Sequence, residues 1–323
     1  MVTPALADRY DIVIVGGGSA GCVMANRLSA DGKRTVLLIE AGKAYPPGQE
    51  PHSLNDPGFR TAFNEANFWP ELSHQVDDSD EDPHLHQARL LGGGSMINGM
   101  HAQRGLPRDY DGWREQGVTG WGWSDVLPFF RKLENDHDFS GPEHGQDGPI
   151  DIMRVPEDRW SPLSHAFRDT LTAKGAASFE DLNSFHGDGV GPVPLNTSPT
   201  RRASALAYLD EKVRLRPNLT ILPETSVRRL IFEGKRVKGV EIDEASSQRM
   251  IAAGDTIVSC GAIHSPLLLL RSGIGPGQQI SDAGVELIAD RAGVGRNLSN
   301  HSMFSMSALV APSGRAAHTQ GPP

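Results

Sequence analysis

The sequence of 323 residues predicts a mixed α/β fold built around a parallel sheet, and two stretches carry this prediction. Residues 11–40 contain an apolar run, a glycine turn, a helical pattern and a second apolar run, which is the order of a strand–helix–strand unit. Residues 219–242 contain short β-type segments separated by turn signals, which predicts an antiparallel meander. Because the two patterns occupy different parts of the chain, we expect α+β character overall.

The first strand of this unit leads into a glycine turn. Residues 12–15 are continuously apolar and rich in β-branched side chains, as in a parallel strand buried on both faces. Gly16, Gly18 and Gly21 follow as G-x-G-x-x-G. The first two glycines allow a tight turn and the close approach of a pyrophosphate, and the third lets the helix lie near the sheet. The helix N-terminus adds free N–H groups directed at the phosphates.

The second strand ends at an acidic residue. Glu40 lies 19 residues beyond Gly21 (40 − 21) and follows the buried run 35–39. A carboxylate at this place can accept hydrogen bonds from an adenosine ribose and would repel a 2′-phosphate. The unit therefore predicts a site for FAD or NAD rather than NADP, and it leaves the choice between FAD and NAD open.

Composition excludes several classes of protein. With 31 basic and 40 acidic residues, net charge −9 and pI about 5.7, a general nucleic-acid or anionic-membrane partner is not expected. No apolar run approaches the length of a membrane span, and no signal peptide is visible. Cys22 and Cys260 are expected to be buried thiols rather than a disulfide, which predicts a cytoplasmic protein. His84 and His86 lack a third ligand at a zinc spacing, so no metal is predicted.

A second glycine-rich stretch spans residues 89–98, RLLGGGSMIN. Three consecutive glycines stabilise neither a helix nor a strand, so they indicate backbone that passes close to a flat or anionic group. Ser95 is expected to cap a helix that carries Asn98.

Four further local predictions concern the later chain. Residues 120–134 predict a short helix whose aromatic side chains pack in the core, and residues 201–213 predict one helix. Residues 256–259 predict a short buried strand. Ser265 followed by Pro266 predicts a helix start, with serine as the N-cap and proline at the first helical position.

Residues 89–111 resemble the first signature of the glucose-methanol-choline (GMC) flavin oxidoreductases. Residues 261–275, GAIHSPLLLLRSGIG, resemble the second signature, and residues 293–301, GVGRNLSNH, resemble a later segment of the family. The resemblance extends over about residues 10–301 and is nearest in RGLPRDYD and GVGRNL to bacterial alcohol oxidases of the 5-hydroxymethylfurfural oxidase type. It implies a Rossmann-type FAD-binding domain with an inserted β-meander, plus part of a substrate or cap domain.

The resemblance also implies domain bounds. Residues 8–135 and 201–302 would form a discontinuous FAD-binding domain, residues 136–200 part of the substrate or cap domain, and residues 303–323 a loop at the start of a truncated substrate domain. No stretch matches the C-terminal region in which the family carries its catalytic histidine. The sequence is therefore expected to be the N-terminal portion of a GMC protein, and we assign no catalytic residue in it.

The same resemblance implies FAD as the cofactor. Some members carry a histidine covalently bound to FAD where this chain has Ile97, so we expect FAD to be held non-covalently. The family pattern would place Asn98 to Met100 along the isoalloxazine and the backbone of Val227 at the adenine. The glycine motif and the resemblance together predict the following cofactor-binding residues: Gly16, Gly18, Ser19, Ala20, Gly21, Glu40, Ala41, Arg89, Leu91, Gly92, Gly93, Ser95, Asn98, Gly99, Met100, Val227, Cys260 and Gly261.

By resemblance, the intact protein would oxidise a primary alcohol, aromatic and furanic alcohols included. The hydride would pass to flavin N5, and O2 or another acceptor would take the electrons. A hydroxynitrile lyase on the same FAD scaffold and a non-catalytic flavin-binding fragment remain alternatives. An NAD-dependent dehydrogenase leaves both signatures unexplained, and a serine hydrolase lacks its G-x-S-x-G motif.

Overall fold

A computed structural model describes residues 6–56, 64–73, 85–184, 187–198, 203–244, 247–301, 309 and 311. The chain forms two compact units. Unit 1 comprises residues 1–51, 63–97 and 205–302, and unit 2 comprises residues 52–62, 98–204 and 303–323. The predicted substrate-domain segment 136–200 belongs to unit 2, and its assignment to a substrate domain stays a prediction.

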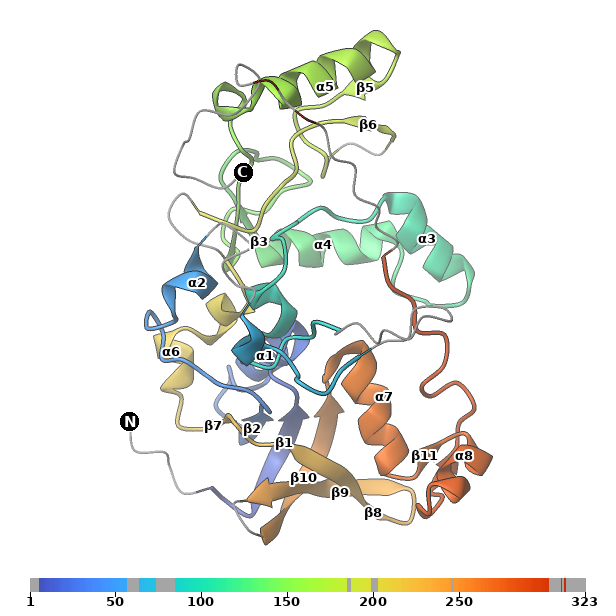
Figure 1. Cartoon of the computed structure of the whole chain (residues 1–323). Coiled ribbons are helices and arrows are strands. Elements are labelled where there is room, and N and C mark those ends of the chain that lie inside the picture. The colour runs from blue at the N-terminus through green and yellow to red at the C-terminus, as the bar shows by residue number, and fades with distance from the viewer. Residues whose placement is uncertain are drawn as a thin grey trace. The chain divides into compact units, whose positions relative to one another are not determined.

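Unit 1 is organised on a six-stranded sheet with the order β7-β2-β1-β10-β9-β8 (Figure 1). Its strands are β1 (Arg9–Val15), β2 (Val36–Ile39), β7 (Leu219–Leu222), β8 (Val227–Glu233), β9 (Arg236–Glu244) and β10 (Ser247–Val258). β7, β2, β1 and β10 pair in parallel, whereas β10, β9 and β8 pair antiparallel. The predicted parallel sheet and β-meander are thus parts of one continuous sheet.

The strand β10 joins the two halves. Its residues 247–252 pair with β9, and residues 252–258 continue alongside β1 in the opposite sense of pairing. The prediction of a short strand at 256–259 was therefore wrong in length. Gly254 lies in the stretch beside β1, where a Cβ would stand 2.7 Å from the carbonyl oxygen of Asp11, so the close approach of the two strands requires glycine.

The helical elements of unit 1 are α1 (Ser19–Leu28), α6 (Glu211–Arg214), α7 (Gly261–Arg271) and α8 (Gly277–Asp282), with the 3₁₀ turns η2 (Glu65–Asn67), η3 (Gly93–Met96) and η5 (Ala205–Leu209). A short pair, β11 (Ile274–Gly275) and β12 (Ala289–Asp290), completes the unit. The single helix predicted for residues 201–213 is instead η5 followed by α6. Residues 201 and 202 lie outside the described part of the chain.

The start of α7 differs from the prediction. The helix begins at Gly261, and Pro266 lies inside it, so Ser265 is not its N-cap. Gly261 has φ +79°, which lets the backbone pass from β10 almost directly into the helix. Pro266 is the sixth residue of α7 and lies beyond the first four N–H groups that lack an intrahelical acceptor, so the serine–proline pair does not mark the helix start here.

The core of unit 1 lies on the sheet. β2 is buried at every position, and residues 12–15 of β1 are buried as well, which confirms the prediction of strands covered on both faces. One cluster of buried side chains unites β1, β2 and the meander with α7 through Leu268, which is 1% exposed. Burial of these apolar surfaces holds the carboxyl ends of β1, β2 and β10 at one edge of the sheet.

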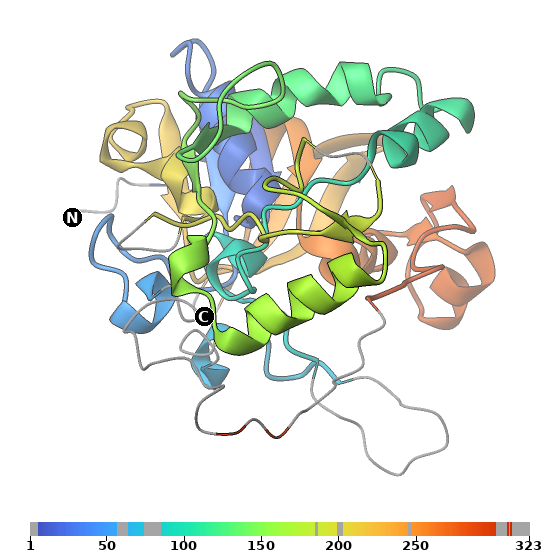
Figure 2. The same cartoon turned by 90° about the horizontal axis from the view of Figure 1, so that it is seen from above.

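Unit 2 is mainly helical and irregular. It contains α2 (His52–Asn55), α3 (Pro107–Glu115), α4 (Trp123–Leu133), α5 (Pro162–Ala173), the turn η4 (Glu157–Arg159), and the strand pairs β3 (Glu134–Asp136) with β4 (Ile150–Ile152) and β5 (Ala177–Ser178) with β6 (Gly189–Val190). α5 lies away from α4 in both views (Figures 1 and 2). In the described parts of both units, no helix is long and apolar enough to cross a bilayer.

Two aromatic side chains expected in the core are exposed. Trp121 is 52% and Phe129 is 70% exposed, so the prediction was wrong for both. Tyr110 of α3 makes ring contacts with Trp123 and Phe130 of α4, and these rings occupy the contact between the two helices. Phe129 is one residue removed from Phe130 and therefore points to a different side of α4.

Candidate functional site

The first glycine turn, between β1 and α1, fits a pyrophosphate. Gly16 has φ +97°, and a Cβ on Gly21 would lie only 2.0 Å from the Gly16 carbonyl oxygen. A Cβ on Gly18 would meet nothing within 4 Å, and no side chain caps the N-terminus of α1 that follows. The first turn of α1 therefore combines open space with N–H groups that an anion can bind.

The second glycine loop lies against the first. The Gly92 N–H donates a 2.8 Å hydrogen bond to the Gly17 carbonyl. A Cβ on Gly93 would stand 2.8 Å from Cα of Gly18. The two loops thus form one cradle, defined here as residues 16–21 and 92–93, in which backbone rather than side chains lines the space.

Ser95 fixes the second loop from within. Its hydroxyl donates to the Gly92 carbonyl at 2.7 Å and accepts from the Ala205 N–H at 3.0 Å. Because Ser95 lies inside η3, it does not cap a following helix, and the prediction of that cap was wrong. The two bonds of the hydroxyl anchor the loop to η5.

Glu40 lies at the end of β2, beside the cradle. Its side chain is 7% exposed, and its two carboxylate oxygens accept 2.8 Å hydrogen bonds from the N–H groups of Gly17 and Gly42. Burial raises the pKa of Glu40, and the two backbone donors oppose that rise. The carboxylate therefore ties the glycine turn to the strand end, and its expected contact with a ribose stays a prediction.

The turn that leads into β8 is hydrogen-bonded to the chain at the end of β2. The Thr225 N–H donates to the Glu40 carbonyl at 3.0 Å, and the Glu224 N–H donates to the Gly42 carbonyl at 2.9 Å. Val227 begins β8 two residues after Thr225 and is buried. The predicted adenine-binding backbone thus lies close along the chain to the predicted ribose-binding acid.

The end of β10 forms the opposite side of the glycine turn. The Ser259 N–H donates to the Val15 carbonyl at 2.8 Å, and the Ser259 hydroxyl donates to the Gly16 carbonyl at 2.8 Å. The Cys260 thiol donates to the Val15 carbonyl at 3.2 Å, and burial raises its pKa to about 11. Cys260 is therefore a neutral structural thiol rather than a nucleophile.

Cys22 is equally unreactive. It is fully buried, and burial raises the pKa of its thiol to about 12. Both cysteines are free, which confirms the prediction that they form no disulfide.

The structure divides the predicted cofactor-binding residues between the two units. Fifteen of them belong to unit 1, where the strand ends and loops described above contain them: Gly16, Gly18, Ser19, Ala20, Gly21, Glu40, Ala41, Arg89, Leu91, Gly92, Gly93, Ser95, Val227, Cys260 and Gly261. Asn98, Gly99 and Met100 belong to unit 2, and their contact with an isoalloxazine stays a prediction. Met100 has φ +62°, a strained value for a residue with a side chain, and its carbonyl accepts from the Asn196 N–H at 2.7 Å.

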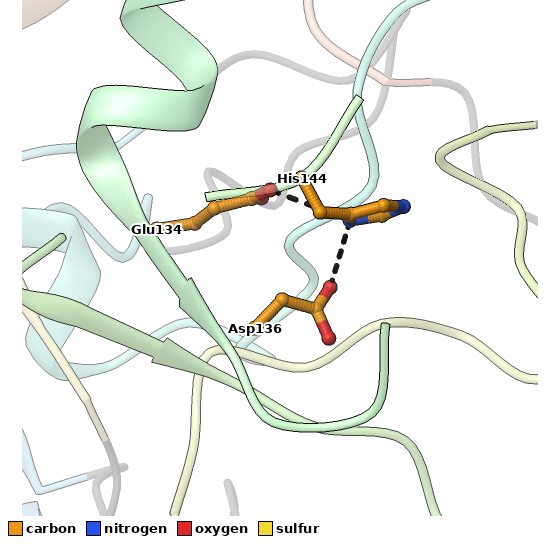
Figure 3. Close-up of side chains that lie close together, drawn as sticks. All are labelled: Glu134, Asp136 and His144. Atoms are coloured by element: carbon orange, nitrogen blue, oxygen red, sulfur yellow. Dashed lines mark ion pairs between the residues drawn. The ribbon is translucent and has the colours of Figure 1, made fainter. Parts of the chain in front are cut away.

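A buried ionic cluster in unit 2 was missed in the sequence. Glu134, Asp136 and His144 place their ligand atoms within 4.8 Å of one another (Figure 3). His144 Nδ1 lies 3.1 Å from Asp136 Oδ2 and 3.4 Å from Glu134 Oε1, and Nε2 lies 3.0 Å from Asp181 Oδ2. All four side chains are at most 4% exposed.

Two arginines complete this cluster. Arg104 contacts Glu134 at 2.6 Å, and Arg154 contacts Asp136 at 2.7 Å and Asp181 at 2.6 Å. Close contacts with Asp136, Asp181 and Glu134 raise the pKa of His144 to about 11, so the ring is an imidazolium at neutral pH; of these contacts only that of Nε2 with Asp181 has hydrogen-bond geometry. Three carboxylates then face three cations, and a protonated Nδ1 of His144 has no lone pair to offer a metal ion. That no metal binds stays a prediction.

A hollow of about 530 Å³ lies on the meander and is lined by Val227, Glu241, Arg271 and neighbouring side chains. None of the cradle residues lines it. It is therefore separate from the backbone cradle.

A parallel sheet, a glycine turn that opens a helix at its carboxyl edge, and an acid at the end of the next strand define a Rossmann-type dinucleotide-binding protein. The sequence profile of the family described as GMC oxidoreductase matches residues 10–303. The chain belongs to this family, as its two glycine-rich signatures predicted. This membership confirms the predicted Rossmann-type FAD-binding domain. It also confirms FAD as the predicted cofactor.

Curated relatives agree with this assignment. The chain is 40% identical over 322 residues to 5-(hydroxymethyl)furfural oxidase of Methylovorus sp., covering 97% of this chain and 61% of that protein. It is 39% identical over 295 residues to oxygen-dependent choline dehydrogenase of Brucella anthropi, covering 90% of this chain and 52% of that protein. The chain thus spans about half to three-fifths of the length of these relatives.

Solved structures give the same result. Pyridoxine 4-oxidase from Mesorbium loti superimposes with a TM-score of 0.73 at 37% identity, covering 87% of this chain and 55% of that one. Formate oxidase from Aspergillus oryzae, in a study of FAD modification, superimposes with a TM-score of 0.79 at 29% identity, covering 90% of this chain and 52% of that one.

Proposed function

We propose that the 323 residues bind FAD non-covalently through the cradle of unit 1. The observation that carries the proposal is the contact of the two glycine loops, in which Gly93 abuts Gly18 at the free N-terminus of α1. Backbone N–H groups and the helix dipole suit the pyrophosphate, and Glu40 and Val227 are the residues proposed for the ribose and the adenine. Ile97 offers no nitrogen for a covalent bond to the flavin.

We propose further that the whole protein oxidises a primary alcohol, with aromatic and furanic alcohols as the preferred class. The similarity to 5-(hydroxymethyl)furfural oxidase and to pyridoxine 4-oxidase supports this class. FAD supplies the two-electron acceptor, and O2 or another acceptor regenerates it. In this proposal these 323 residues bind and orient the cofactor. We assign the proton-accepting histidine to no residue of this chain.

We also propose a cytoplasmic location and no nucleic-acid partner. Two free cysteines suit a reducing compartment, and the net charge of −9 would repel a polyanion.

The test is an anaerobic titration of the flavin-loaded chain with an aromatic alcohol, followed by visible absorption. Bleaching of the flavin bands would show alcohol oxidation by these residues alone. Yellow flavin that persists with this chain but bleaches with the full-length protein would assign binding to this chain and oxidation to the whole. Persistence in both would instead favour a lyase on the same scaffold.

A further inference from the structure

Three side chains of unit 1 form a stack that the cradle does not account for. The rings of Trp69 and His264 have centroids 4.1 Å apart and are inclined by 31°, and Cζ of Arg89 lies 4.8 Å from the centroid of the Trp69 ring. The three residues come from separate segments of the sequence. We call this group the Arg89 stack.

The backbone that carries Trp69 and Arg89 is a short two-stranded ladder. The Arg89 N–H donates to the Asn67 carbonyl at 2.7 Å, and the Trp69 N–H donates to the Gln87 carbonyl at 3.0 Å. Phe68 and Ala88 form the antiparallel bridge between these bonds. The ladder fixes the register of indole and guanidinium, so their contact is built into the backbone.

The Arg89 stack lies at the same sheet edge as the cradle. A Cβ on Gly42 would lie 1.9 Å from the Arg89 carbonyl oxygen, so the Arg89 backbone presses against the turn that follows Glu40. The charge of Arg89 also opposes the rise that burial causes in the pKa of Glu40. His264 belongs to the beginning of α7, just after Cys260 at the end of β10. The guanidinium is therefore held near the predicted ribose-binding acid.

Among the described residues, Glu40 is the carboxylate on which the charge of Arg89 acts, but the two side chains form no salt bridge. No carboxylate forms an ion pair with it there, and its Nε is buried without a hydrogen-bond partner. Nε2 of His264 is buried in the same way. Burial and the charge of Arg271 lower the pKa of His264, so the imidazole is neutral and can stack beside a cation without repulsion. A partly desolvated guanidinium with no carboxylate in direct contact and an unsatisfied Nε is stabilised when a ligand supplies an anion.

We propose that Arg89 binds the phosphate on the adenosine side of the cofactor, and that Trp69 with His264 positions its guanidinium for this contact. This inference rests on the proposed FAD site and deepens it. Guanidinium nitrogens recognise phosphate oxygens in a planar, bidentate way, which a rigid stack favours over a free arginine side chain.

The test is calorimetric titration of the flavin-free chain with ADP and with adenosine, which lacks the phosphates. Arg89→Gln is expected to weaken ADP binding about ten- to a hundredfold and to change adenosine binding less than about twofold. Trp69→Ala is expected to weaken ADP binding about fivefold, and Trp69→Phe to restore most of it. Arg236→Gln makes the same charge change at an exposed position of the meander and is expected to leave ADP binding unchanged.

Three results would overturn the inference. An Arg89→Gln chain that binds ADP as tightly as the unmodified chain refutes the phosphate contact, and so does one that binds ADP and adenosine equally more weakly. Failure of Trp69→Phe to restore what Trp69→Ala loses refutes the positioning pair. If the unmodified chain binds FAD and the variants bind ADP as tightly as it does, only this inference is refuted. If the unmodified chain binds neither FAD nor ADP, the proposed function is refuted as well.

Discussion

Replacing His144 by asparagine tests the buried ionic cluster of unit 2. The imidazolium faces Asp136, Asp181 and Glu134, and Arg104 and Arg154 supply the two other positive charges. His144→Asn leaves three buried carboxylates against two cations. Removing one partner of a buried ion pair typically costs about 3–5 kcal/mol, so we expect a loss of this size in the free energy of unfolding at pH 6.

The pH dependence of the free energy of unfolding gives a more specific expectation for His144. The folded pKa of His144 is about 11, above the unfolded value of about 6.5, so its stabilisation is complete below pH 6.5 and is lost as pH rises toward 11. One proton held only in the folded state corresponds to about 1.4 kcal/mol per pH unit in this window. Between pH 6.5 and pH 8.5, the unmodified chain should therefore lose about 2 kcal/mol that His144→Asn does not lose, because the unfolded histidine is still half protonated at pH 6.5.

The carboxylates that pair with His144 determine how stability changes at low pH. The ion pair with His144 and the hydrogen bonds from Arg154 lower the pKa of Asp136 to about 2, and contacts with the same two cations lower the pKa of Asp181. Their stabilisation is present above the unfolded value of about 3.9 and is lost as pH falls through the folded value. The cluster thus stabilises unit 2 most between about pH 4 and pH 6.5.

The assay is urea unfolding of both chains from pH 6 to pH 9, with an NMR titration of the His144 ring. His137→Asn is the matched control, because His137 also pairs with a carboxylate, Asp151 at 2.8 Å, but is 39% exposed. An exposed pair contributes about 0–1 kcal/mol, so the control should change little. Unfolding curves for His144→Asn and the unmodified chain that stay parallel over this pH range would show that His144 is neutral and would refute the reasoning.

Three other predictions follow from the same geometry. Gly21→Ala places a Cβ 2.0 Å from the Gly16 carbonyl oxygen and should cost about 3 kcal/mol in urea unfolding, whereas Gly112→Ala, in open space on α3, should gain about 1 kcal/mol. Glu40→Gln turns an amide NH2 toward the N–H of Gly17 or Gly42 and should cost about 1–3 kcal/mol; an unchanged midpoint would show that the carboxylate does not hold the turn. Equimolar Zn²⁺ or a chelator should shift the thermal midpoint by less than about 1 °C, because arginines already occupy the carboxylates of the ionic cluster; a rise of several degrees would reveal a metal site.

The nucleotide-binding unit was predictable because its signals are local. A glycine turn, a helix and a spaced acid lie within residues 11–40. A Cβ on Gly16 or Gly21 would clash with nearby backbone, whereas Gly18 borders open space. Boundaries were less predictable where a neighbouring element sets them. α7 begins at Gly261 because β10 ends at Val258 and Gly261 turns the chain directly into the helix, and no pattern near Ser265 indicates this.

The ionic cluster could not be read from the sequence. Arg104 and Glu134 are 30 residues apart, and His144 and Asp181 are 37 apart, so no period or motif joins them. Charged residues in such segments usually face solvent, and only the fold shows that these are buried. The Arg89 stack was equally hidden, since Trp69 and His264 meet across almost 200 residues of chain (264 − 69 = 195).

The most direct test of the central claim is the visible spectrum of the purified chain, followed by the spectrum of the supernatant after acid precipitation. We predict flavin bands in the first and, in the second, yellow FAD released into solution, since Ile97 provides no covalent attachment. A colourless chain that also fails to bind added FAD would contradict the assignment of the glycine cradle, and flavin retained in the pellet would contradict non-covalent binding.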